Sequence, residues 1–236
     1  MQLLSRTQKI LNAIVEDYIQ SAKPVSSRQI ALKFAISPAT VRNEMMKLEK
    51  QHLITQPYTS AGRVPTDEAY HFYISCLHKE LLAEKVRNLL AKKLRSIPDY
   101  EGLVRGATRM LAEISGNIAI SRPSAQRGIY YAGLANALKQ PESLDLDFTT
   151  AIGEIIDYIN DNAGALAATC IDDSTEIYIG RQNPFYTYDS CSLLLSGYEN
   201  PLGEQCFVGV LGPKRMNYQR IIPVIKYISK VLEEVG

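Results

Sequence analysis

The fold of the N-terminal part is decided by SPATVRNEMMKLEKQHL, residues 37–53. Ser37 is a common N-cap residue and Pro38 fits the first helical position, where its missing N–H costs nothing, so a helix begins here. At about 100° per residue, Val41 and Leu48 fall on one stripe, which would pack inside the protein. The opposite face is unusual for a surface helix because it combines small, amide, thioether and basic side chains. These residues are Ala39, Asn43, Met46 and Lys50.

Such side chains near a helix N-terminus suit the major groove of DNA. Asn can pair with adenine and Arg with guanine through two hydrogen bonds each, and Ala or Thr can contact a thymine methyl group. The alternative is that this face packs on another subunit. The candidate contacts to DNA on this segment are Ser37, Ala39, Thr40, Arg42, Asn43, Lys47 and Lys50.

Two helices are predicted before this one. Apolar residues at helical spacing after Ser5 indicate a helix that ends before Pro24. Ser26 or Ser27 can cap a second, short helix that stops near Ile36. Three helices, the last two joined by a tight turn, make a helix-turn-helix.

A wing is predicted directly after the helix-turn-helix. The segment LITQPYTSAGRVPT indicates short strands at 53–56 and 63–65. Between them, Gly62 permits the positive φ that a tight turn needs. Ser60 and Arg63 can place a hydroxyl and a guanidinium against phosphates or in a minor groove, so both are candidate DNA contacts.

A further helix is predicted from Thr66 to about Leu94. It carries more apolar positions than one contact with a small domain needs, so we expect part of it to pair two protomers, although burial within one protomer is the alternative. The residues predicted for dimerisation are Tyr73, Leu77 and Leu81.

Composition and charge limit the class of protein. The chain has 236 residues, of which 46% are hydrophobic and 22% charged, enough for two modest domains. No apolar run approaches the ~20 residues of a membrane span, and MQLLSRTQK lacks the apolar core of a signal peptide, so we expect a cytoplasmic protein. The net charge is +1, yet residues 20–63 hold seven Lys or Arg and two Asp or Glu. This excess favours a polyanionic partner, with a solvated basic surface as the alternative.

The second half of the chain is typical of an α+β domain. We expect helices at 103–115 and 147–163, with Gly164 beyond the end of the second, and a closing helix at 218–234. The expected strands are 117–121, 175–180, 189–198 and 204–212, with a hairpin turn at 199–204.

No catalytic or metal-binding pattern stands out. The four cysteines fit no zinc spacing and the three histidines supply no companion ligands, so we expect buried thiols, no metal and no cofactor. P-loop, G-x-G-x-x-G and H-E-x-x-H motifs are absent from the sequence, and we expect no enzyme. Tyrosines of the second half could line a ligand pocket or belong to the core. They are Tyr130, Tyr131, Tyr178, Tyr186, Tyr188, Tyr198 and Tyr218.

Four stretches carry a resemblance to a known family. PVSSRQIALKFAISPATVRNEMMKLEKQHLITQPYTSAGRVPTDEAYHFYI (24–74) closely resembles the N-terminal winged-helix domain of the HrcA family, the bacterial heat-inducible transcription repressors. IYYAGLANALKQPE (129–142), EIYIGRQNP (176–184) and GVLGPKRMNYQRIIPVIKYISKVL (209–232) resemble the C-terminal end of the family. Members usually carry a longer middle with an inserted dimerisation domain, where RPSAQRG (122–128) here makes a direct connection. The resemblance therefore indicates a short form that lacks the insert.

The resemblance implies a fold, a function and partners. The implied α+β fold has a winged helix-turn-helix domain at 1–75, a helical linker at 76–98 and a truncated GAF-like regulatory or dimerisation domain at 99–236. The implied function is repression of class I chaperone operons (GroE and DnaK) by a homodimer that binds an inverted-repeat operator in double-stranded DNA and is released on heat stress. A GroEL-type chaperonin is implied as modulator, and Arg28 joins the DNA-binding residues. Two alternatives remain, a winged-helix regulator gated by a small-molecule effector in the C-terminal domain and a winged-helix protein-interaction module.

Overall fold

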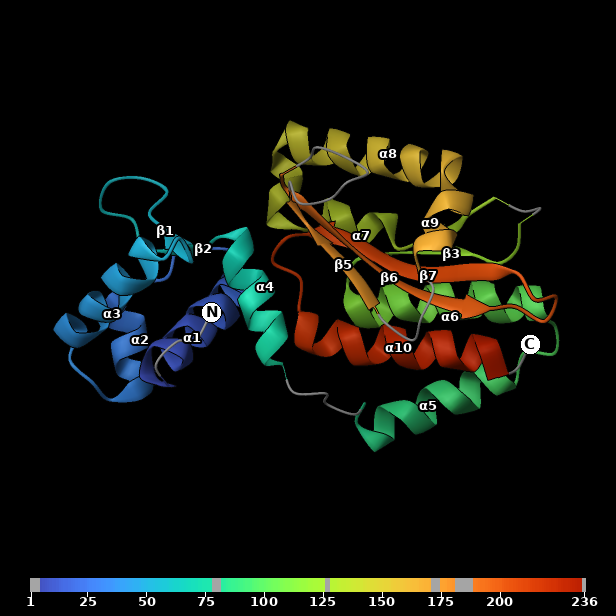
Figure 1. The fold of residues 1–236 in the computed structure, drawn as a ribbon, viewed down its shortest axis with the longest axis horizontal. Coiled ribbons are helices and arrows are strands. Elements are labelled where there is room, and N and C mark those ends of the chain that lie inside the picture. The colour runs from blue at the N-terminus through green and yellow to red at the C-terminus, as the bar shows by residue number, and fades with distance from the viewer. Residues whose placement is uncertain (1–4, 78–81, 126–127, 171–174, 181–188, 235–236) are drawn as a thin grey trace. The chain divides into compact units, whose positions relative to one another are not determined.

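The computed structural model describes residues 5–77, 82–125, 128–170, 175–180 and 189–234. The chain divides into two compact units, Met1–His78 and Lys79–Gly236. Figure 1 shows the helices and strands of each unit. Within the described residues, no helix is both long and apolar enough to cross a membrane.

The first unit combines helices with a small antiparallel sheet. Its helix α1 buries Ile10, Leu11, Ile14 and Val15, the apolar stripe that the sequence predicts. Contacts join α1 to each of the other three helices, so α1 is the centre of this unit. The described elements are α1 (Ser5–Ser21), α2 (Ser27–Phe34), α3 (Pro38–Lys50), β1 (Ile54–Thr55), β2 (Val64–Pro65) and α4 (Asp67–Cys76).

Local hydrogen bonds define the turn between α2 and α3. Ser26 is the N-cap of α2, where its hydroxyl accepts from the backbone N–H of Gln29 while the Gln29 side chain accepts from the Ser26 N–H. Ala35 ends α2 in the left-handed conformation at φ 53°. Ser37 then caps α3 by accepting from the Thr40 N–H at 3.0 Å. The two capping serines fix where each helix starts and so fix the turn.

The turn after β1 is built differently from the prediction. Gly62 does not have a positive φ; the left-handed residue is Ser60, at φ 68°. Glycine is required at 62 for another reason, because a Cβ there would lie 2.5 Å from the carbonyl oxygen of Val25. The backbones of Val25 and Arg63 exchange two hydrogen bonds of 2.8 Å, which attach the chain just before α2 to the strand pair β1–β2.

The single helix expected from Thr66 to Leu94 is wrong, because the structure has two. The first, α4, ends at Cys76, and Leu77 has the extended dihedrals φ −63° and ψ 114°. The second, α5 (Glu84–Arg95), belongs to the second unit and contacts α6 and α10 there through the buried Leu90 and Leu94. The sequence between the two helices contains no Gly or Pro that would mark the break.

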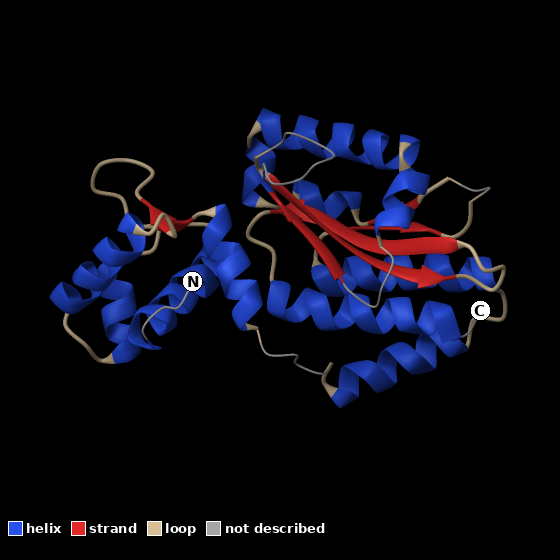
Figure 2. Ribbon diagram, in the orientation of Figure 1, coloured by secondary structure: helices blue, strands red, loops and turns tan. Residues whose placement is uncertain are grey.

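A five-stranded antiparallel sheet in the order β4-β3-β7-β6-β5 forms the second unit (Figure 2). Helices α6 and α10 contact one face of the sheet. Helices α7, α8 and α9 lie on the other face. Side chains along each strand point alternately to the two faces of the sheet. Ile118 and Ile120 of β3, for example, join the core beneath α8 and α9. This mixed α+β arrangement fits the expected GAF-like fold.

The bounds of the second unit agree closely with the predicted segments. The closing helix spans the predicted residues, and Gly116 ends α6 at φ 66°. One expectation is wrong: Gly164 does not follow a helix end but lies within the separate short helix α9. The elements are α6 (Tyr100–Ser115), β3 (Ile118–Arg122), β4 (Tyr130–Ala132), α7 (Leu134–Leu138), the 3-10 helix η1 (Pro141–Leu144), α8 (Leu146–Asp161), α9 (Ala163–Thr169), β5 (Thr175–Ile179), β6 (Cys191–Glu199), β7 (Gln205–Pro213) and α10 (Tyr218–Glu234).

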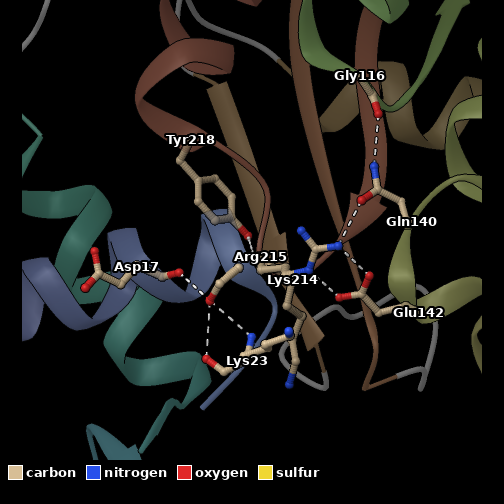
Figure 3. A network of polar contacts seen from close by, with 9 residues as sticks. Asp17, Lys23, Gly116, Gln140, Glu142, Lys214, Arg215 and Tyr218 are labelled. Atoms are coloured by element: carbon tan, nitrogen blue, oxygen red, sulfur yellow. Dashed lines mark hydrogen bonds and ion pairs between the residues drawn. The ribbon is translucent and has the colours of Figure 1, made fainter. Parts of the chain in front are cut away.

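A polar network closes one end of this unit (Figure 3). Arg215, between β7 and α10, donates to Glu142 at 2.7 Å and to Gln140 at 2.9 Å. The amide of Gln140 in turn donates to the carbonyl oxygen of Gly116 at the end of α6, 3.1 Å away. The Arg215 side chain is only 10% exposed, so its charge is largely buried. Its hydrogen bonds to Gln140 and Glu142 join the β7–α10 connection to the segment after α7, and through Gln140 to the end of α6.

Candidate nucleic-acid interface

Helix α3 divides into a buried and an exposed face as the sequence predicts. Val41 and Leu48 are fully buried and Met45 nearly so. The exposed face carries Ala39, Arg42, Asn43, Met46, Lys47 and Lys50. Met46 is 51% exposed although it is apolar, and no described residue covers this face. The structure thus brings the predicted base-reading residues together on one open helix surface.

A buried acid holds α3 against α1. Glu44 is 8% exposed and accepts a hydrogen bond of 2.7 Å from the hydroxyl of Thr7, which is itself buried. The ammonium of Lys47 donates to the other Glu44 oxygen at 2.8 Å. These two hydrogen bonds, Lys47 first, lower the pKa of Glu44, so the carboxylate is charged at neutral pH. Lys47 therefore has a structural partner besides any ligand.

A second ion pair connects α3 to the turn region. The Arg63 guanidinium donates to one Glu49 oxygen through two nitrogens, at 3.0 and 3.2 Å. Arg63 is a predicted phosphate contact, and it is only 20% exposed in this pair. Its position beside α3 is set by Glu49 and by the backbone bonds to Val25. Ser60 is exposed at the tip of the turn.

One of the predicted contacts, Ser37, also serves as the N-cap of α3 and is linked to a second, Thr40. The Ser37 hydroxyl accepts from the Thr40 N–H, and the two hydroxyls lie 2.9 Å apart. Both residues stay at the surface, so each hydroxyl can turn toward a ligand only by sharing its capping bond. Arg28, on α2, is exposed.

The residues predicted for dimerisation are differently placed. Tyr73 is 3% exposed, so its ring offers almost no surface to a second protomer. Leu77 is half-buried after the end of α4, and Leu81 lies outside the described residues. Of the two that the structure describes, only Leu77 is partly exposed.

The described tyrosines of the second unit lie in different environments. Tyr218 is fully buried and donates to the carbonyl oxygen of Lys214 at 2.6 Å, whereas the hydroxyl of Tyr130 donates to Glu101 at 2.8 Å. Tyr198 is buried, Tyr131 is half exposed, and Tyr186 and Tyr188 lie outside the described residues.

Three of the four cysteines are buried, as expected, whereas Cys76 at the end of α4 is only half-buried. Burial raises the pKa of Cys170, Cys191 and Cys206 to about 11, so each is a protonated, unreactive thiol. The described residues contain no group of three His, Cys, Asp or Glu side chains that could hold a metal ion.

Two features of this surface were not found from the sequence. Thr7 and Glu49 were never singled out, because their partners lie 37 and 14 residues away along the chain. The available signal for these ion pairs was the presence of carboxylates inside a basic segment, since Glu44 and Glu49 are the two acids among residues 20–63. Both turn out to bind a cation of that same segment.

Comparison with known families assigns the chain. A family model described as HrcA protein C terminal domain matches residues 21–222. The chain therefore belongs to the HrcA family.

Relatives in this family share the name heat-inducible transcription repressor HrcA. The relative from Natranaerobius thermophilus is 27% identical over 337 positions, which cover 98% of this chain and 96% of that protein. The one from Desulfitobacterium hafniense is 44% identical over 119 residues, which are 49% of this chain and 34% of the relative. An alignment of 337 positions with a chain of 236 residues must leave long stretches of the relative without a counterpart, which agrees with a short form of the family.

One solved structure shares the whole fold. A crystal structure titled as a hypothetical protein superposes with a TM-score of 0.81 at 22% identity and covers 99% of this chain and 98% of that chain. At this identity the likeness concerns the fold alone.

Proposed function

We propose that this protein is a winged-helix transcription repressor of heat-shock chaperone operons of the GroE and DnaK class. It binds an inverted-repeat operator as a homodimer and is released on heat stress. The observation that carries the proposal is the open face of α3, where Ala39, Asn43 and Lys50 are exposed together on a helix whose other side is buried. The names of the relatives favour the same function.

The remaining elements of the first unit support this use of α3. A helix-turn-helix followed by two short antiparallel strands is the element order of a winged helix. In that assignment α3 lies in the major groove, and Ser60 and Arg63 of the wing contact the phosphate backbone or the minor groove. The ion pair between Arg63 and Glu49 fixes the wing relative to α3, so both can meet DNA without rearrangement.

Dimerisation follows from the needs of specific binding. One recognition helix covers few base pairs, whereas a two-fold dimer reads two half-sites and matches the symmetry of an inverted repeat. The second unit, residues 79–236, supplies the protomer contact and the response to heat, with a GroEL-type chaperonin as modulator. A role on bacterial DNA places the protein in the cytoplasm and assigns it no enzymatic activity.

The proposal is tested by titrating the full-length protein against three duplexes. These are the inverted repeat upstream of the host's chaperone operons, the same duplex with one half-site scrambled, and a duplex with both scrambled. We expect the intact repeat to bind tightest, by roughly 10³-fold or more over the fully scrambled duplex at physiological salt. Equal affinity for all three duplexes contradicts specific repression, and equal affinity for the first two contradicts the dimer.

A further inference from the structure

Helix α5 presents a second basic surface, separate from the helix-turn-helix. Its twelve residues include five cations and one acid, Glu84. The rest of the second unit, residues 79–236 without α5, has the opposite balance, with 12 Lys or Arg and 18 Asp or Glu. The positive charge of an otherwise acidic unit is thus collected on one helix. The five cations, all exposed, are Lys85, Arg87, Lys92, Lys93 and Arg95.

The five cations of α5 make no ion pair with the residues that the structure describes. Some exposed cations elsewhere in the same unit are paired, as Arg105 is with Glu101 and Lys230 with Glu234, whereas α5 gathers on twelve residues five that have no described ion-pair partner. Like charges this close repel each other, so an unneutralised row of them is a cost that an anionic partner would remove.

We infer that α5 contacts the phosphate backbone of the DNA beside the operator half-site read by α3, an inference that rests on the proposed function. Lys85 and Lys92 are seven residues apart and so lie on the same side of the helix, opposite the buried Leu90 and Leu94. A duplex carries one negative charge per ~1.7 Å of its axis, which complements such a row of cations. The contact adds affinity without base specificity.

The length of the connecting chain makes this contact possible. Cys76 ends α4 and Glu84 begins α5, so eight residue steps separate the two helices. A fully extended chain of that length spans at most roughly 29 Å, which is less than the ~34 Å of one turn of DNA. Whatever the arrangement of the two units, α5 begins within about one DNA turn of the end of α4.

A lipid surface is the less suitable anionic partner. A helix that lies in a membrane interface inserts its apolar face between the acyl chains. The apolar face of α5 is already occupied, because Leu90 and Leu94 are fully buried within the protein. The cationic side of α5 also carries Leu89, which is 54% exposed. The surface offers charge rather than apolar area, which favours phosphates of a duplex over a bilayer.

The test compares two variants of the full-length protein that lose the same charge. Lys85→Ala with Lys92→Ala removes two cations of α5, and Lys139→Ala with Lys226→Ala removes two exposed lysines elsewhere in the same unit. Alanine suits the exposed helix positions 85, 92 and 226, while Lys139 directly follows α7, and equal melting temperatures confirm that both variants fold. Affinities for the operator duplex and for a scrambled duplex are measured between about 50 and 200 mM salt.

We expect the α5 variant to lose about 1.8 per bound protomer from the slope of log affinity against log salt on both duplexes, so its deficit shrinks roughly tenfold per bound protomer across that salt range. The control variant keeps the wild-type slope, and the preference for operator over scrambled DNA is unchanged in both. A wild-type slope in the α5 variant refutes the inference and leaves the proposed function standing. Loss of binding to phosphatidylglycerol vesicles by the α5 variant, with an unchanged DNA slope, also refutes it in favour of a lipid partner. If the wild type shows no preference for the operator yet the slope falls as expected, α5 contacts DNA and the proposed function fails instead.

Discussion

Replacing Glu44 by alanine should loosen α3 from α1, because this carboxylate is the polar link between the two helices. Thr7 donates to one of its oxygens at 2.7 Å and Lys47 to the other at 2.8 Å. The Thr7 residue is only 4% exposed, so water cannot easily take the place of the lost acceptor. The recognition surface on the other side of α3 would then lose its fixed orientation.

The magnitude follows from the burial of each partner. Leaving the Thr7 hydroxyl without an acceptor costs about 1 to 3 kcal/mol. The Lys47 ammonium is 55% exposed, so its pair with Glu44 contributes at most about 1 kcal/mol. We expect Glu44→Ala to lower the free energy of unfolding of this unit by about 2 to 3 kcal/mol. Thr7→Val should lower the free energy of unfolding less in the Glu44→Ala variant than in the wild type, because it removes the hydroxyl that Glu44→Ala leaves unsatisfied.

A double-mutant cycle in the full-length protein measures this coupling. Native-state hydrogen exchange of the α1 and α3 amides gives the opening free energy of the first unit without requiring that the whole chain unfold in one step. The expected interaction energy between Thr7 and Glu44 is about 1 to 2 kcal/mol. Additive effects, within about 0.3 kcal/mol, would show that the hydrogen bond contributes nothing to the packing of α3.

The same link should make the stability of this unit depend on pH. Its hydrogen bonds hold the pKa of Glu44 below the ordinary value of 4.5. A group with a lowered folded pKa stabilises the protein above its unfolded pKa, and the contribution is lost as the pH falls through the folded pKa. The stability difference between wild type and Glu44→Gln should therefore be largest above pH 4.5 and shrink on acidification. A difference that grows below this pH contradicts the assignment.

Further predictions concern DNA contacts and the turn. Asn43→Ala should cost roughly 1 to 3 kcal/mol of operator affinity and leave scrambled DNA nearly unaffected, as measured by fluorescence anisotropy; equal losses on both DNAs contradict base reading. Lys50→Ala should weaken both DNAs alike and lower the salt slope by about 0.9 per bound protomer, and an unchanged slope removes Lys50 from the interface. Gly62→Ala should destabilise the first unit in hydrogen exchange, because its Cβ would lie 2.5 Å from the Val25 carbonyl oxygen; wild-type protection would show that the backbone yields easily.

Features that depend on neighbours in sequence could be predicted. Capping by Ser26 and Ser37 and the stripe of Val41 and Leu48 use residues within one or two turns of a helix, and the structure has them where expected. The expected bounds of the closing helix, Tyr218–Glu234, are those observed.

Features that depend on distant residues could not. The end of α4 at Cys76 has no local stop signal, and the next helix, α5, buries Leu90 within the second unit rather than continuing α4. The requirement for Gly62 comes from Val25, 37 residues earlier, and the partner of Arg63 is on a different element. The sequence singled out Gly62 for a positive φ, which is the wrong reason. It singled out Arg63 as a phosphate contact but did not predict the ion pair with Glu49.

Footprinting of the full-length protein on DNA upstream of the host's chaperone operons tests the central claim most directly. The account predicts protection of two half-sites related by a two-fold axis, lost after brief heating and absent for the Asn43→Ala variant at the same concentration. The same experiment with Lys139→Ala, far from α3 in sequence, should give the wild-type footprint. Uniform protection along the DNA, or a footprint that Asn43→Ala retains unchanged, would contradict recognition of an operator by α3.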